Sequence, residues 1–286
     1  MKHVTALLMS LMLCLSFVFG GLTALAAEPA ADEAWRAAED PTLSKELRDA
    51  FFQAADGLLG VSYEPLFCLG SRESAAGSDF SVFCRATVVS AEAGSRYAIV
   101  QLRQTEEGCE LIDITAMAPN GQVEQDPGPA EGLVGGWSVP EDERAGLNAF
   151  TKATEGLLGV DYMPLCVLGQ QLVAGMNYCV LCQATVVYPD AQPCYTLAVV
   201  YAALDGSASV TRWIELDGSG LPAAPECITI DGQSYALQGT DSTEARCGVM
   251  DGVSDEGYDW QLGPEEGTVS LCWNGVWLLY AEEGEG

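Results

Sequence analysis

Cysteine is the residue type in this sequence whose number and spacing most invite a chemical interpretation. The chain has 11 cysteines, and Cys179 and Cys182 form a C-x-x-C pair. Two such thiols can exchange a disulfide or bind zinc only if both sulfurs reach one site. This pair lies in an apolar run that predicts a β-strand, where residues three apart point to opposite faces. We therefore interpret both cysteines as structural.

Histidine is absent after His3. Its absence excludes Ser-His-Asp and Cys-His catalysis and every zinc site that contains histidine. Pairs of carboxylates can hydrolyse glycosides, but no acidic pair here stands in a cleft-forming context, and no glycine-rich phosphate loop is present. We therefore expect no enzymatic activity, no cofactor and no metal site.

Residues 1–26 have the pattern of a cleaved secretory signal: a basic start, an apolar stretch and an A-x-A site. No later run is long enough to span a bilayer, so we expect a secreted, extracellular protein without a membrane anchor. Removing the segment takes Lys2 and leaves 11 basic against 41 acidic residues, a net charge of −30. This charge disfavours nucleic acids and anionic membranes as partners. We expect a monomer.

A tandem duplication is the strongest structural signal in the chain. The sequence A-F-F-Q-A-A-D-G-L-L-G-V from Ala50 recurs as A-F-T-K-A-T-E-G-L-L-G-V from Ala149, and C-R-A-T-V-V from Cys84 recurs as C-Q-A-T-V-V from Cys182. Each copy begins with an apolar stripe at helical spacing and continues with four strand-like runs. We expect each copy to be an α+β module, a helix packed on a four-stranded antiparallel sheet.

Turn and capping signals set the expected boundaries. Asp40 before Pro41 predicts the start of the first helix, and the capping box of Ser138 and Glu141 predicts the start of the second. Hairpin signals near the C-terminus predict a small all-β meander. The expected organisation is a signal peptide at 1–26, a linker at 27–40, repeat 1 at 41–118, a linker at 119–132, repeat 2 at 133–217, a linker at 218–226 and the β-meander module at 227–286.

Residues 171–175 of repeat 2 read Q-L-V-A-G between two strand-like runs, which predicts a hairpin tip. Gly175 supplies a positive φ and allows another backbone to come close. Leu172 and Val173 are apolar where turn-forming residues are expected, so the tip has the character of a wedge. Q-x-V-x-G on a hairpin after an amphipathic helix resembles the first inhibitory loop of the cystatins, which block papain-like cysteine proteases.

The resemblance implies two further contact elements in repeat 2. One is a short glycine-containing segment ahead of the helix, and the other is a second hairpin tip, which here lacks the family's Pro-Trp and offers a leucine instead. Repeat 1 reads E-S-A-A-G at its tip and is expected to be a scaffold. The expected protease-binding residues are Leu133, Val134, Gly135, Gly136, Gln171, Leu172, Val173, Ala174, Gly175 and Leu204.

The function implied by the resemblance is inhibition of papain-like cysteine proteases by non-covalent occlusion of the active-site cleft. The missing Pro-Trp and the degenerate tip of repeat 1 favour an alternative from another class. In that alternative, the secreted cystatin-like fold is a binding or surface-association module without inhibitory activity.

Ten cysteines remain when Cys14 leaves with residues 1–26, and an even number in a secreted chain predicts disulfides. We align Cys68 and Cys84 with Cys166 and Cys182. The predicted pairs are Cys68–Cys84 and Cys166–Cys182, with Cys179–Cys194 on the other side of the sheet. The cysteines left without an assigned partner are Cys109, Cys227, Cys247 and Cys272.

Overall fold

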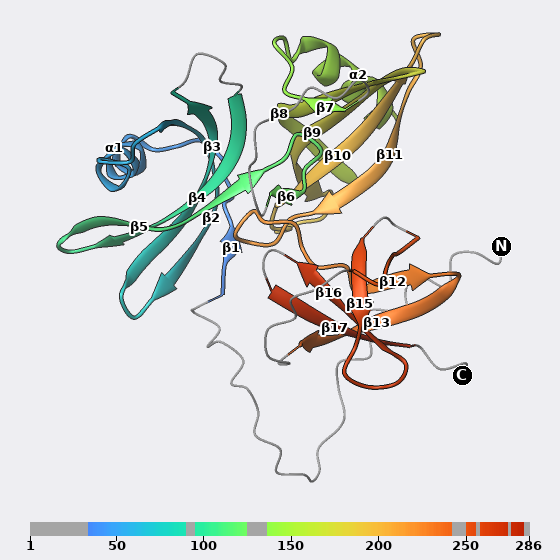
Figure 1. The fold of residues 1–286 in the computed structure, drawn as a ribbon. Coiled ribbons are helices and arrows are strands. Elements are labelled where there is room, and N and C mark those ends of the chain that lie inside the picture. Colours follow the sequence, from blue (N-terminus) through green and yellow to red (C-terminus); the bar gives the residue numbers. More distant parts are fainter. Residues whose placement is uncertain are drawn as a thin grey trace. The chain divides into compact units, whose positions relative to one another are not determined.

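The computed structural model describes residues 34–89, 95–124, 136–241, 250–255, 258–273 and 276–282. Within these ranges the chain forms 17 strands and two helices, arranged in three antiparallel sheets (Figure 1). The expected signal segment lies outside the described residues. No helix in the described ranges is long and apolar enough to cross a membrane.

Repeat 1 forms a six-stranded sheet with its strands in chain order. Helix α1 (Lys45–Ala54) packs Phe51 against one face of this sheet, beside Val82 and Val100. The strands are β1 (Arg36–Ala37), β2 (Val61–Ser74), β3 (Gly77–Val88), β4 (Ser95–Thr105), β5 (Gly108–Met117) and β6 (Val123–Glu124).

Repeat 2 forms a five-stranded sheet, also in chain order. Helix α2 (Arg144–Thr154) packs Phe150 against one face, beside Val180 and Ala198. The strands are β7 (Trp137–Ser138), β8 (Val160–Val173), β9 (Gly175–Val186), β10 (Cys194–Ala203) and β11 (Ala208–Glu215).

The C-terminal region forms a small all-β module, but the expected meander is wrong, because the six strands of its sheet do not neighbour one another in chain order. Asp231 and Gly232 both have positive φ, as a tight two-residue hairpin requires. The strands are β12 (Cys227–Ile230), β13 (Gln233–Thr240), β14 (Gly252–Val253), β15 (Asp259–Leu262), β16 (Thr268–Trp273) and β17 (Val276–Glu282).

The expected α+β class is wrong, because the described part of the chain is mostly β and the two helices in it have only 10 and 11 residues. The reason is that the repeat sheets are not covered by a helix alone. Leu69, Phe83 and Ile99 of repeat 1 share one buried cluster with Leu181 and Leu197 of repeat 2. Each sheet therefore buries one face against its helix and the other against the second sheet, so the repeats are not separate helix-on-sheet modules.

Equivalent residues of the two repeats make reciprocal contacts across this shared core. The Tyr97 hydroxyl donates to the Val167 carbonyl at 3.2 Å, and the Tyr195 hydroxyl donates to the Ala38 carbonyl at 2.8 Å. The Ser81 hydroxyl donates to the Ser219 carbonyl. Residue 219 therefore packs on repeat 1, although the sequence places it in a linker.

Both helices begin later than the capping signals predict. Ser44 caps α1 by accepting from the Leu47 amide at 3.0 Å, whereas Asp40 accepts from the Thr42 amide upstream. Ser138 lies in β7, and α2 begins at Arg144 with Glu143 as an N-cap that makes no side-chain capping bond. Glu143 instead accepts from the Val167 amide and the Arg85 guanidinium, so it ties the helix start to both sheets.

The shared core predicts that the repeats unfold together. Leu181 is fully buried in it, so Leu181→Ala is expected to lower the free energy of unfolding by about 2–5 kcal/mol. Hydrogen exchange read separately on peptides of the two repeats, in increasing urea, is expected to show one common transition for both. Leu158→Ala, at a site that is 95% exposed, is the control and is expected to change stability by less than about 0.5 kcal/mol. Loss of protection in repeat 2 while repeat 1 stays protected would contradict a common core.

Candidate functional site

The tips of the β8–β9 and β10–β11 hairpins lie side by side at one end of the repeat 2 sheet. Ala203 lies opposite Gly175 in the register of β9 and β10, so the two turns are level with one another (Figure 1). Leu172 is 69% exposed, Val173 is 42% exposed, and Leu204 is 89% exposed. Three apolar side chains of the expected binding set therefore share one exposed end of the sheet.

Hydrogen bonds from neighbouring elements hold these tips in place. The Tyr201 hydroxyl of β10 donates to the Ala174 carbonyl at 2.7 Å, and the Lys152 ammonium of α2 donates to the Gly206 carbonyl at 3.3 Å. Asn177 donates from its amide to the Gln171 side-chain oxygen at 2.9 Å. Gln171 therefore braces its own hairpin.

Gly175 is required by the sheet itself. The residue is buried with a φ of 148°, and a Cβ atom there would lie 2.5 Å from the Ala202 carbonyl oxygen. Gly77 of repeat 1 has a φ of 142° and an equivalent clash with the Gln104 carbonyl oxygen. Because repeat 1, which has no apolar tip, also needs this glycine, the presence of Gly175 does not by itself indicate a binding partner. The features that indicate a binding partner are the exposed apolar side chains of Leu172 and Val173.

The third expected element is described only at its end. Gly136 is exposed and directly precedes β7, and Trp137 of β7 lies opposite Gln171 near the tip of β8. The chain thus enters the sheet beside the β8–β9 hairpin, as the sequence-based hypothesis requires. The remaining expected residues of this element, Leu133, Val134 and Gly135, lie outside the described residues.

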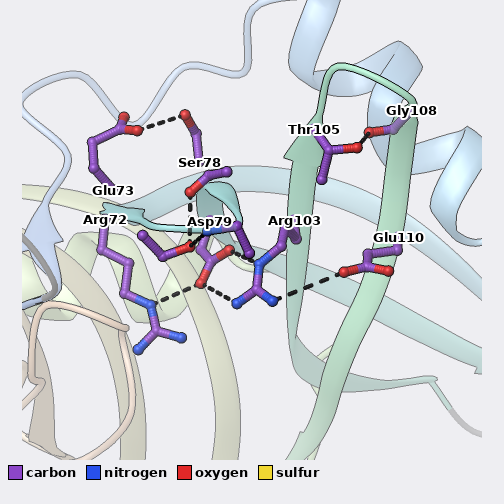
Figure 2. Close-up of polar contacts among 11 residues, drawn as sticks. Arg72, Glu73, Ser78, Asp79, Arg103, Thr105, Gly108 and Glu110 are labelled. Carbon is purple, nitrogen blue, oxygen red and sulfur yellow. Dashed lines mark hydrogen bonds and ion pairs between the residues drawn. The ribbon is translucent and has the colours of Figure 1, made fainter.

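Repeat 1 carries a buried ion cluster at the equivalent end of its sheet (Figure 2). The fully buried Asp79 carboxylate accepts from the Arg72 guanidinium at 2.8 Å and from the Arg103 guanidinium at 2.7 and 3.0 Å. Glu110 lies 3.9 Å from Arg103, and Trp35 stacks under Arg72 at 4.7 Å. Sequence reasoning missed this cluster, because its three members are scattered over three strands.

The same three register positions are neutral in repeat 2. Asp79 lies opposite Arg72 and Arg103, just as Asn177 lies opposite Gln171 and Tyr201. The row beneath the hairpin tip is therefore an ion cluster in one copy and an amide–tyrosine row in the other. Only the neutral row stands beneath an apolar tip.

The cysteines lie in positions that suit packing. Cys179 belongs to the core shared by the two sheets and Cys182 to the core under α2, so the C-x-x-C sulfurs face opposite sides, as expected. Burial raises the pKa of Cys179 to about 12 and that of Cys68 to about 11. These thiols are therefore protonated at neutral pH and are poor nucleophiles.

The structure is compatible with one predicted disulfide pair and does not support the other two. Cys68 and Cys84 share the core under α1, which is compatible with the predicted pair, although the two thiols are not joined by a disulfide in the structure. Cys166 and Cys182 lie on opposite faces of the sheet, so the structure does not support that pair.

The physical reason is a shift of one residue in the alignment of the repeats. Cys166 lies opposite Leu181 as Phe67 lies opposite Phe83, so Phe67, not Cys68, is the counterpart of Cys166.

The pair Cys179–Cys194 is not supported either. Cys194 lies opposite Ala184, two residues from Cys182, and so it shares the face of Cys182. Of the four cysteines without an assigned partner, Cys247 lies outside the described residues, while Cys109 and Cys227 form no disulfide in the structure.

Comparisons with known proteins add nothing to this geometry. No family model matches the sequence, and no curated protein matches it. Among the described residues, no group of histidine, cysteine, aspartate and glutamate side chains could hold a metal ion. The site is therefore defined by its own geometry, an exposed apolar end of a braced sheet.

The Asp79 cluster makes stability depend on acid pH. Burial alone would raise the pKa of Asp79, but hydrogen bonds from Arg103 and Arg72 outweigh it and hold the pKa below its ordinary value. A depressed folded-state pKa stabilises the fold above the unfolded pKa, about 3.9, and this contribution is lost as pH falls through the folded pKa. Asp79→Asn is expected to lower the free energy of unfolding at pH 7 by about 1–3 kcal/mol, because hydrogen bonds to a buried group are lost while the arginines keep some contact with solvent.

Urea unfolding at several pH values between about 7 and 2 measures both effects. Wild type is expected to lose more unfolding free energy on acidification than Asp79→Asn, and the exposed Asp56→Asn is the control. Parallel pH profiles for wild type and Asp79→Asn would mean that the ion cluster does not stabilise the fold.

Proposed function

We propose that this protein inhibits papain-like cysteine proteases by inserting the apolar end of the repeat 2 sheet into the active-site cleft. The observation that carries the proposal is the convergence of Leu172, Val173 and Leu204 on two adjacent, braced hairpin tips. The resemblance of Q-L-V-A-G to the first inhibitory loop of the cystatins supplies the class of protease. The proposal rests on these tips and not on the fold class.

Occlusion of a cleft needs apolar contact area and a rigid shape, and no covalent chemistry. Burying a leucine or valine side chain in a partner contributes about 1.5–3 kcal/mol, and a few central anchors dominate most interfaces. Tyr201 and Lys152 already hold the tips by hydrogen bonds to Ala174 and Gly206. Little conformational entropy is then lost on binding. Leu204 takes the place of the Pro-Trp of the resembling family.

A second candidate function is favoured by a different surface. Leu158 is 95% exposed and Val187 and Tyr188 are 73% and 76% exposed at the opposite end of the repeat 2 sheet. Leu59 and Val89 repeat this pattern in repeat 1, at 94% and 74%. Large exposed apolar groups of this kind mark association surfaces. A surface-association module without inhibitory activity would use these loops and leave the hairpin tips unused.

Introducing a negative charge at the apolar side chains of the hairpin tips tests the inhibitor proposal. Leu172→Asp and Leu204→Asp place a carboxylate where an apolar subsite would close over leucine. Each is expected to weaken inhibition of papain by roughly 10- to 150-fold, the equivalent of one lost anchor. The measurement is the inhibition constant against a fluorogenic peptide substrate, with circular dichroism confirming that each variant is folded.

Leu158→Asp is the matched control, because it makes the same chemical change at an exposed leucine in the loop before β8, at the opposite end of the same repeat. It is expected to leave inhibition unaltered. Equal losses from Leu158→Asp and Leu172→Asp would place the contact elsewhere. If the wild-type protein does not inhibit papain, the inhibitor proposal is wrong and the surface-association function is preferred.

A further inference from the structure

A cavity of about 270 Å³ lies where the end of repeat 1, strand β11 of repeat 2 and the C-terminal sheet meet. Neither of the functions proposed above uses it. Its apolar wall includes Ile214 of β11, Leu271 of β16 and the rings of Tyr258 and Trp273. Leu271 is only 2% exposed, so the cavity reaches down to the C-terminal core.

The aromatic wall is fixed in position. The Trp273 indole nitrogen donates to the Pro222 carbonyl at 2.9 Å, and the Tyr258 ring meets the Trp273 ring edge to face at 5.3 Å. The segment that carries Pro222 joins repeat 2 to the C-terminal sheet. Two held aromatic rings form a surface on which a planar or apolar group packs without first ordering the wall.

The rim of the cavity carries one charge of each sign. The Arg212 guanidinium lies on the β11 side and the Asp259 carboxylate on the β15 side, and both residues are exposed. Among the residues that the structure describes, neither makes a hydrogen bond or ion pair with another side chain. The rim thus offers a group of opposite charge to a carboxylate and another to an ammonium group.

We propose that this cavity binds a small zwitterion with an apolar or aromatic side chain, the chemistry of a free amino acid such as phenylalanine. The carboxylate pairs with Arg212, the ammonium pairs with Asp259, and the side chain packs on Tyr258 and Trp273. The volume lies just below the range of about 300–1,000 Å³ typical of pockets for drug-sized ligands. A simple anion is disfavoured by the net charge of −29, and a simple cation by Arg212.

Isothermal titration of the whole protein with three phenylalanine derivatives tests the proposal. L-Phenylalanine is expected to bind with a dissociation constant of about 1 mM or tighter. Phenylalaninamide lacks the carboxylate and N-acetylphenylalanine lacks the ammonium group. Each is expected to bind roughly tenfold more weakly, since each loses one charge-assisted contact. Absence of binding by L-phenylalanine, or equal binding of all three, would overturn the proposal.

Two variants assign the contacts. Arg212→Gln is expected to abolish the preference for phenylalanine over the amide and to keep the preference over the N-acetyl compound. Asp259→Asn is expected to do the reverse. Arg144→Gln, at an arginine 88% exposed on α2 and away from the cavity, is the control and is expected to change nothing. Unaltered preferences in both cavity variants would show that phenylalanine binds elsewhere.

Discussion

The burial of both faces of each repeat sheet is the constraint on which the rest of the structure depends. Tyr97 and Tyr195 occupy equivalent positions, and each donates a hydrogen bond to backbone of the other repeat from within the shared core. With one face closed in this way, each helix has only the outer face of its own sheet to cover. The ends of the sheets are then the places where apolar side chains stay in solvent. The candidate surfaces for a protein partner on the two repeats are therefore hairpin tips and loops.

The two repeats differ in the chemistry of the residues beneath their hairpin tips. Asp79 in repeat 1 needs Arg72 and Arg103, because a buried carboxylate without partners is costly. Repeat 2 has Asn177 with Gln171 and Tyr201 in the same register, and a neutral row has no such cost. Tyr201 is then free to reach the tip and bind the Ala174 carbonyl. The divergence of the row beneath the tip is thus tied to the divergence of the tip itself.

The sequence predicts the repeats, the hairpins and the positions of the tips, because these depend on local patterns of apolar and turn residues. It misleads where tertiary contacts decide. The run 178–187 is apolar almost throughout, which indicates a strand buried on both faces, whereas the expected helix-on-sheet module covers only one face of each sheet. The structural requirement for Gly175 is not visible along the chain, because the Ala202 carbonyl that a Cβ atom would meet lies on another strand. The charged row of Asp79 leaves no pattern along the chain, since each member comes from a different strand.

The two exposed apolar ends of repeat 2 differ in how firmly neighbouring elements hold them in place before a partner binds. Leu158 lies in the loop before β8, where the Gly159 carbonyl accepts a backbone hydrogen bond from the Val187 amide at 2.9 Å. The opposite end is held by Tyr201 from the neighbouring strand and by Lys152 from the helix. An anchor on a tip that is also held by side chains of other elements loses less entropy on binding than one on a less restrained loop of equal apolar area. For equal area, a partner with a rigid cleft is therefore expected to bind the Leu172 end more tightly than the Leu158 end.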